Sequence, residues 1–402
     1  MTSRERVRAV LEHRIPDRVP NGLGGCETEG LHIVAYDTLQ KVLGVERRPP
    51  RLDTFMTNTV FDLPVIKAME GDIILLASMN MCRSELRGDG IEDQWKEQTL
   101  WGRTFYVPAG DHFTLRDDGV IVWDTAGGAV CPKGSYFFDH KGYTDLLADF
   151  ETPDPDKFHP RDTIDENRLR RLEKAAKQLY EETDLSLCLG ECITDLQVAP
   201  GGMVGSMVLM KEEPDVMREL LDKCAEAGLR QIELLDQAVG QYVDILSVAH
   251  DLGDNRGVTI GAQLWRDIYK DAYRKYFRGW RERTKMRVNL HSCGSIAEIL
   301  PDLIECGLEV LNPVQTSAAG MDAASLKEKF GKDVVFWGGA YNPHLIGENA
   351  GYDEVYSKVR KNVETLGAGG GFIFAGVHNL PATLPKEHIR AMLDAWRDAR
   401  DY

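Results

Sequence analysis

Short apolar runs alternate with helix-forming stretches over most of this chain, and this alternation limits the fold more than any other feature. Parallel strands covered on both faces read as continuous apolar runs, as these do. We predict strands at residues 18–25, 72–78, 185–191, 243–251, 288–290, 308–313, 334–339 and 372–378. We predict helices at residues 166–182, 214–239, 264–284, 296–306, 323–330, 352–366 and 386–400. Eight strands joined by helical crossovers favour an α/β fold, a (β/α)8 TIM barrel, over an open sheet.

Two further segments are predicted outside this repeating pattern. An N-terminal helical extension begins near Thr2, which forms a capping-box pattern with Glu5, and Pro16 ends it. Residues from about 90 to 145 alternate aromatic side chains with Gly, Pro and Asp-Asp-Gly turns, which predicts an inserted antiparallel β-meander. Because no internal repeat or low-complexity tract is visible, residues 1–402 are expected to form a single barrel domain carrying this insert.

The charge balance excludes several classes of function. The 402-residue chain has 43% hydrophobic residues, 28% charged residues and a formal net charge of -16, typical of a soluble protein with a large core. Sequence-independent binding to nucleic acid or to an anionic membrane requires a basic surface, so neither partner is expected. The sequence shows no apolar run long enough for a bilayer, no signal-peptide core and no Cys-x-x-Cys pair among its eight cysteines. We therefore expect a cytoplasmic protein with reduced thiols.

The residues that follow the predicted strands carry most of the candidate chemistry. In a barrel of this class the carboxyl ends of the strands converge on one face, where active sites lie. Those ends read Cys26/Glu27, Asn80/Cys82, Glu191/Cys192, His250/Asp251, His291/Cys293, Asn312/Gln315, Tyr341/Asn342 and His378/Asn379. Apolar strands with polar tips are typical of a barrel enzyme.

Two ligands for soft metals, His291 and Cys293, follow the predicted strand at residues 288–290. Alternate residues of a strand share a face, so the two side chains are predicted to point the same way. Zinc requires at least three protein ligands. The pair alone therefore leaves two interpretations open, a metal site or a buried histidine beside a free thiol.

Several motifs together resemble one family. In the C-terminal half they are His-Ser-Cys-Gly-Ser (291–295), Leu-Asn-Pro-Val-Gln-Thr-Ser-Ala-Ala-Gly-Met (311–321), Leu-Lys-Glu-Lys-Phe-Gly (326–331), Phe-Trp-Gly-Gly (336–339) and Gly-Gly-Gly-Phe-Ile-Phe with His-Asn-Leu (369–380). Pro-Asp-Arg-Val-Pro (16–20) and Val-Asp-Ile-Leu with Asp-Leu-Gly (243–253) agree with them. As a set these motifs resemble the uroporphyrinogen decarboxylase-like superfamily, and within it the corrinoid-dependent methyltransferase branch, over nearly the whole chain.

The resemblance implies a third metal ligand. The methyltransferase relatives carry His-x-Cys after the fifth strand and one more soft ligand, often a Cys, after the eighth. The matching position here is His378, which implies a zinc ion held by His291, Cys293 and His378. Cys26 and Glu27 are left open, either as a fourth ligand or as packing against the first strand.

The same resemblance implies an enzyme that moves a methyl group between a small O-, S- or N-methyl substrate, such as a methyl ether, and the cobalt of a corrinoid. The chain has no Asp-x-His-x-x-Gly cobalamin motif, so the corrinoid is expected on a separate protein that docks over the strand ends. The direction is open, because transfer from a methylcorrinoid to a thiol or to tetrahydrofolate is an alternative.

Decarboxylation of uroporphyrinogen itself is not expected. The decarboxylases of the superfamily hold their many-carboxylate substrate with paired arginines in an N-terminal motif. This chain has Pro-Asn-Gly-Leu-Gly-Gly-Cys-Glu-Thr-Glu (20–29) there, and its acidic groups would repel such a substrate. The chain also departs from its methyltransferase relatives at His250, Tyr341 and residues 380–381, all near the barrel mouth, which leaves the substrate open.

The remaining site predictions come from the same strand ends. Glu191, His250 and Asp251 are the candidate acid-base groups, although Glu191 and Asp251 could instead orient a metal-bound histidine. The candidate substrate-binding residues are Glu27, Asn80, Gln315 and Tyr341. A metal-independent lyase or decarboxylase that uses the acid-base groups alone is the alternative function. A homodimer is one option for the oligomeric state.

Overall fold

The computed structural model describes residues 1–53, 57–77, 95–139 and 151–402, so the predicted site residue Asn80 and its neighbour Cys82 lie outside the described residues. Among the described residues, seven strands form one parallel sheet in the order β14-β13-β12-β11-β10-β9-β3. They are β3 (Ile73–Ala77), β9 (Ser186–Leu189), β10 (Val243–Ala249), β11 (Arg287–His291), β12 (Val310–Asn312), β13 (Val335–Trp337) and β14 (Phe372–Ile373).

Residues 20–22 take the place of the eighth strand and join the two edges of this sheet. On the β14 side, Gly22 N donates to Phe374 O and Phe374 N donates to Pro20 O, each at 2.8 Å. On the β3 side, Asp72 N donates to Asn21 O at 2.8 Å. The strand predicted at residues 18–25 is shorter than expected, but its backbone closes the barrel. The predicted fold class is therefore confirmed.

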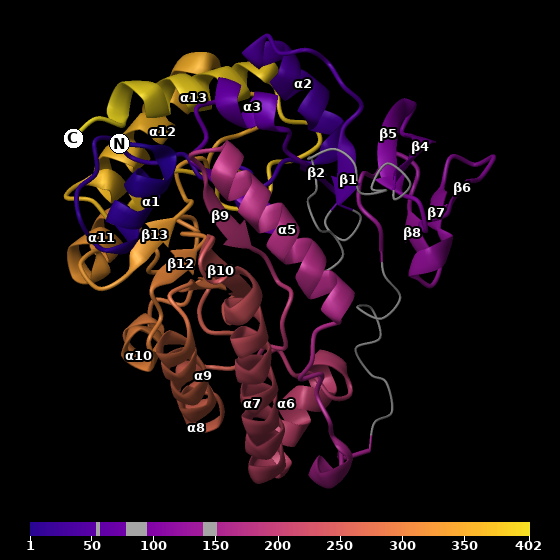
Figure 1. The fold of residues 1–402 in the computed structure, drawn as a ribbon, viewed down its shortest axis with the longest axis vertical. Helices are drawn as coiled ribbons and strands as arrows, with labels where there is room; N and C mark the ends of the chain where they lie inside the picture. Colours follow the sequence, from indigo (N-terminus) through magenta and orange to yellow (C-terminus); the bar gives the residue numbers. More distant parts are fainter. Residues whose placement is uncertain (54–56, 78–94, 140–150) are drawn as a thin grey trace.

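Helices cover the outside of the barrel (Figure 1). Three of them, α5 (Glu166–Glu182), α7 (Pro214–Val239) and α11 (Ala323–Phe330), have the predicted bounds, because an Asp N-cap or a first-turn Pro marks each start. The others in the described part are α1 (Ser3–Leu11), α2 (Ile33–Leu43), α3 (Leu63–Ala68), α6 (Gly202–Glu212), α8 (Ala262–Ile268), α9 (Lys270–Arg283), α10 (Leu300–Cys306), α12 (Tyr352–Gly367) and α13 (Lys386–Ala399), with 3-10 turns at Asp124–Ala126 and Pro155–Lys157. The sequence did not predict α2 or α6.

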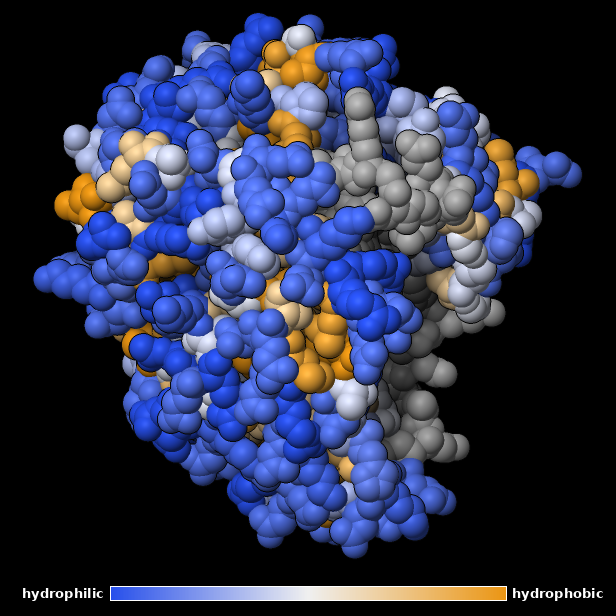
Figure 2. Space-filling model, in the orientation of Figure 1, coloured by the Kyte–Doolittle hydropathy of each residue, from blue (hydrophilic) through white to orange (hydrophobic). Residues whose placement is uncertain are grey.

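The surface of the molecule is mostly hydrophilic on the face drawn in Figure 2, where apolar side chains gather only in small areas. Within the described ranges, each helix is either too short or too polar to serve as a bilayer span.

The predicted N-terminal helix α1 covers the amino-terminal end of the barrel. Its capping box between Thr2 and Glu5 is present. Val7 and Val10 are fully buried and belong to the same apolar cluster as the barrel residues Ile245 and Ile373. Since α1 occupies this end, the carboxyl ends of the strands remain as the face on which a site can be built.

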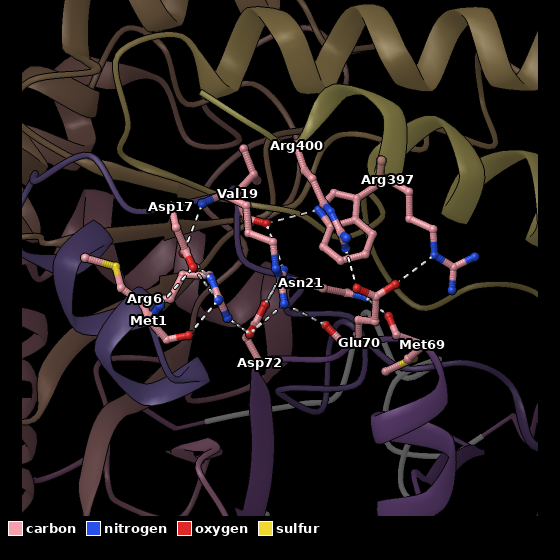
Figure 3. Close-up of polar contacts among 12 residues, drawn as sticks. Met1, Arg6, Asp17, Val19, Asn21, Met69, Glu70, Asp72, Arg397 and Arg400 are labelled. Carbon is pink, nitrogen blue, oxygen red and sulfur yellow. Dashed lines mark hydrogen bonds and ion pairs between the residues drawn. The ribbon is translucent and has the colours of Figure 1, made fainter.

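A buried ion network ties this end of the barrel together (Figure 3). Asp72, which is fully buried, accepts hydrogen bonds from Arg6 Nη1 at 2.6 Å and from Arg18 Nη1 at 2.9 Å. Glu70, two residues before Asp72, accepts a hydrogen bond of 2.6 Å from Nη1 of Arg400, the residue after α13. The network therefore links α1, the start of β3 and the last helix.

The predicted insert forms two small sheets and extends beyond its expected bounds. One sheet is the antiparallel set β6 (Phe113–Leu115), β7 (Ile121–Trp123) and β8 (Ala129–Cys131). The other has the order β2-β1-β5-β4, made of β2 (Asn58–Val60), β1 (Arg51–Asp53), β5 (Arg103–Pro108) and β4 (Trp95–Leu100). Because β1 and β2 precede β3 and span three residues each, they carry too little periodicity to be predicted.

His32 connects the insert to the barrel. Its Nε2 donates to Tyr136 O at 2.9 Å, and its ring lies edge-on to those of Trp101 and Tyr136. Burial lowers the pKa of this imidazole to about 4, so it is neutral at neutral pH. His32 also caps α2, and Gly30, two residues before it, bonds to Asn379 and Leu380, which lie beyond β14.

Candidate metal centre

Three predicted metal ligands meet at the carboxyl end of the barrel. His291 ends β11, Cys293 follows it by two residues, and His378 lies beyond β14. One ligand atom of each lies within 4.8 Å of the other two, and the two histidine rings are edge-on at a centroid distance of 5.1 Å. Among the described residues, no other three His, Cys, Asp or Glu side chains lie close enough to share an ion. Cys26 and Glu27, the candidates for a fourth ligand, do not belong to this group.

The spacing within the group suits a tetrahedral ion. The distance from His291 Nε2 to Cys293 Sγ is 3.5 Å. Zinc bonds to nitrogen at roughly 2.0–2.1 Å and to sulfur at roughly 2.3 Å, so a tetrahedral zinc spaces these two ligand atoms about 3.5 Å apart. The three residues therefore fit a zinc ion in donor type, and the His291–Cys293 pair also fits it in spacing.

The turn that carries Cys293 is held by the neighbouring loops. Cys293 N donates to Asp251 Oδ1 at 2.9 Å, and Gly294 N donates to Gln315 Oε1 at 2.8 Å. Gly294 has a φ of 82°, and a Cβ there would lie 2.4 Å from the carbonyl of Gly253. Only glycine fits this close approach, which explains the Cys-Gly sequence of the turn.

His291 is bonded on its far side as well. Its Nδ1 lies 2.8 Å from Asn312 Oδ1. Thr28 Oγ1 donates to the same oxygen at 3.0 Å, and Asn312 Nδ2 donates to Glu29 Oε1 at 2.8 Å. Glu29 and Asn312 are both fully buried, so this network lies beneath the three ligands rather than at the surface.

Burial keeps the groups of the site neutral. It lowers the pKa of His378 to about 4, with a smaller contribution from His291, and it lowers the pKa of His291 as well. Burial also raises the pKa of the Cys293 thiol to about 12, and it raises the pKa of Glu29 well above its usual range. Neutral imidazoles are the form that binds a metal, and a cation bound at Cys293 would displace the thiol proton.

The three predicted acid-base residues lie in different surroundings. Asp251 is at the rim, with its side chain 66% exposed and Oδ1 3.9 Å from His291 Nε2. Glu191 is half-buried, and its backbone N–H donates to the Glu27 carboxylate. His250 points away from the three ligands, because its Nδ1 lies 2.9 Å from the hydroxyl of Tyr273 on α9. Asp251 is therefore the acid-base candidate that the structure brings to the ligands.

The predicted substrate-binding residues are mostly occupied by the protein itself. Gln315 uses both ends of its amide, since Oε1 accepts from Gly294 N and Nε2 donates to Asn255 Oδ1 at 2.8 Å. Tyr341 is buried, and its hydroxyl lies 2.9 Å from His388 Nδ1 on α13. Glu27 is buried and accepts from Glu191 N. Asn80 lies outside the described residues.

The buried network under the ligands was not predicted from the sequence. Asn312 was placed at a strand end without a role, Glu29 was considered only as an acidic group of residues 20–29, and Thr28 was given no role. One signal could have found Asn312, because β11 and β12 are neighbours and His291 pairs with Asn312 in their register. Thr28 and Glu29 follow no regular strand, so periodicity could not place them.

Comparison with known proteins adds two findings on sequence. A sequence model of the uroporphyrinogen decarboxylase (URO-D) family matches residues 154–399, more than half of the chain. A curated uroporphyrinogen decarboxylase from Methylococcus capsulatus is 26% identical over 196 residues, which cover 46% of this chain and 50% of that protein. The chain thus spans about half the length of this relative.

Comparison with solved structures gives a match over the whole chain. It is a methyltransferase from Methanosarcina mazei, with a TM-score of 0.57 and 16% sequence identity over 99% of both chains. At this identity the likeness shows the fold alone, and it agrees with the barrel described above.

Proposed function

Because the chain belongs to the uroporphyrinogen decarboxylase family, we propose that it is a zinc-dependent methyltransferase that works with a separate corrinoid protein. The observation that carries this proposal is the convergence of His291, Cys293 and His378 within 4.8 Å of one another. A methyltransferase with the same fold supports it, since such a barrel accommodates methyl transfer in that protein.

The donor set suits a catalytic rather than a purely structural zinc. Three protein ligands leave a fourth position for substrate, as in known catalytic zinc sites. When bound, zinc would supply Lewis acidity toward an oxygen or sulfur atom of the methyl donor or acceptor. His291 and His378 would contribute neutral nitrogen ligands, and Cys293 would contribute the single negative charge.

Asp251 is the residue of this chain that we assign to proton transfer. Its carboxylate is exposed at the rim and lies 3.9 Å from a ligand nitrogen, so it can reach both a bound substrate and solvent. It also accepts the backbone hydrogen bond of Cys293, which holds it beside the ligands. Glu191 stays a second candidate, whereas His250 is assigned to the packing of α9.

Residues 20–29 argue against decarboxylation of uroporphyrinogen, the reaction for which the family is named. Glu27 and Glu29 are both buried at the mouth of the barrel, in the stretch where the resembling decarboxylases carry paired arginines. Residues 20–29 contain no arginine that could pair with the carboxylates of such a substrate. We therefore propose a small methyl donor or acceptor as the substrate, with both directions of transfer open.

The zinc content of the purified protein tests the proposal. We expect about one zinc per chain, and a loss of most of it in Cys293→Ala and in His378→Ala. Cys224→Ala, a change of a buried thiol on α7, is the matched control and should keep the metal. Methyl transfer would be followed as the colour change of a Co(I) corrinoid protein on addition of candidate methyl ethers. A metal-free protein with full methyl-transfer activity would overturn the zinc mechanism. A folded protein that binds no zinc and transfers no methyl group would instead favour the lyase or decarboxylase alternative.

A further inference from the structure

The hydrogen bonds of Asn312 leave its amide one orientation. Oδ1 accepts from the hydroxyl of Thr28 and faces Nδ1 of His291. Nδ2 donates to Glu29 Oε1 at 2.8 Å and to the carbonyl of Trp337 at 3.3 Å. Both lone-pair directions of the oxygen and both hydrogens of the nitrogen are thus used.

The opposite orientation of the amide would break these contacts. A flipped amide would turn its oxygen toward the carbonyl of Trp337, so that two acceptors would face each other, and its NH2 group would meet Nδ1 of His291. Since Asn312 is fully buried, no solvent could compensate the lost bonds. The amide oxygen is therefore fixed toward His291, and His291 must offer a hydrogen at Nδ1.

We propose that Asn312, held by Thr28 and Glu29, is a positioning residue that fixes His291 as the Nδ1–H tautomer and so keeps Nε2 free to bind the ion. This inference rests on the proposed zinc function. It goes beyond it, because it assigns a role to three buried residues that do not touch the metal.

The ring nitrogen of His291 that faces Cys293 is Nε2, the one that the Nδ1–H tautomer leaves free of hydrogen. Nε2 of His291 lies 3.5 Å from Cys293 Sγ, and the His291 ring lies edge-on to the ring of His378. A histidine free to change tautomer would spend part of its time with a hydrogen on Nε2, which blocks that ligand atom. Hydrogen bonds to the second nitrogen of a metal-bound histidine typically change metal affinity roughly 10- to 100-fold.

The test measures the tautomer and the metal separately. Nitrogen NMR of the metal-free protein with 15N-labelled histidine reports which ring nitrogen carries the hydrogen, and the His291 signals are assigned by their loss in His291→Gln. Zinc affinity is measured by competition with a chromogenic chelator. For Asn312→Leu we expect loss of the pure Nδ1–H tautomer and a zinc affinity roughly 10- to 100-fold weaker.

Two variants separate positioning from a general effect on the barrel. Asn312→Asp keeps an acceptor for His291 Nδ1, so it should keep the tautomer and lose less affinity than about 10-fold. Asn289→Leu is the matched control, because Asn289 is equally buried on β11 but bonds to Ser247 instead of the ligands. It should change neither quantity. Thr28→Val, which removes one bond to Asn312 Oδ1, provides a milder change if Asn312→Leu does not fold.

The results distinguish this inference from the proposed function. If folded Asn312→Leu shows the same tautomer and the same zinc affinity as the wild type, the inference is overturned. If Asn312→Leu does not fold, the same result in Thr28→Val overturns it. An Nδ1–H tautomer that is lost in the variant, in a protein that binds no zinc, would support the positioning role and overturn the zinc function. A wild-type protein that binds zinc, but whose His291 carries its hydrogen on Nε2 when metal-free, would support the zinc function and overturn the positioning role.

Discussion

The two ends of the barrel bury polar groups in opposite ways. At the amino end, the fully buried Asp72 is matched by Arg6 and Arg18, so each charge has a partner. At the carboxyl end, burial instead shifts Cys293 and His378 toward their neutral forms. The charges at the amino end are already paired, so they stabilise the fold. The neutral ligands at the carboxyl end keep lone pairs with which they can bind a cation.

The largest expected effect comes from breaking the paired end. Asp72→Ala leaves Arg6 and Arg18 buried without a counter-charge, so it should lower the free energy of unfolding by about 3–5 kcal/mol. Urea denaturation followed by circular dichroism measures this change. Asp17→Ala is the control, since Asp17 also pairs with Arg6 but is 41% exposed, and it should cost only about 1 kcal/mol. Loss of zinc binding in the folded Asp72→Ala protein would contradict the separation of the two ends.

A smaller effect is expected from Glu29→Gln at the mouth, and it should depend on pH. Burial raises the pKa of Glu29 in the folded state, so the folded protein retains a proton that the unfolded chain releases. Its contribution to stability is therefore complete below the unfolded pKa of about 4.3 and is lost as the pH rises through the folded pKa. Glutamine cannot ionise, so the variant should gain stability relative to the wild type as the pH rises.

Urea denaturation of both metal-free proteins across a series of pH values above about 4.3 measures this difference. A difference that stays constant with pH would mean that burial does not disfavour the ionised form of Glu29.

The smallest effect is expected from His250→Gln. Burial lowers the pKa of His250 from 6.5 to about 4, so the folded protein loses stability as the pH falls through that range. The variant should lose less stability than the wild type over this pH range. The difference should be small, because the ring is only half-buried and solvent screens its charge. Thermal unfolding between these pH values measures it. The zinc content should not change, and its loss would contradict the assignment of His250 to the packing against Tyr273.

Much of the fold could be predicted, because local signals mark it. The helices α5 and α11 begin at an Asp cap and α7 at a proline, and all three have the expected bounds. The helix α6 was missed because its run of Gly, Met and Val has no polar face to give a period. The short strand β2 pairs with β1, and β1 pairs with β5, which lies far along the chain, so no local pattern encodes them.

The candidate site was predictable in its ligands and less so in its surroundings. The convergence of strand ends brings His291, Cys293 and His378 together, although they come from different parts of the sequence. The direction of a single side chain was harder to predict, because His250 follows the end of β10 and its ring bonds to the hydroxyl of Tyr273 on α9. Tyr341 follows two glycines with φ of 89° and 95°, which break the alternation and turn its ring toward α13.

The closure of the barrel joins early and late parts of the chain. Residues 20–22 complete the sheet by bonding to Phe374, and Val19 N donates to Arg400 O at 2.7 Å. During translation, the N-terminal stretch leaves the ribosome long before these partners have been made. The growing protein must therefore keep an open sheet edge until its last helix appears, and such edges invite pairing with other chains. Closure of the barrel therefore waits for residues 372–400, so the complete sheet can form only when nearly the whole chain has been synthesised.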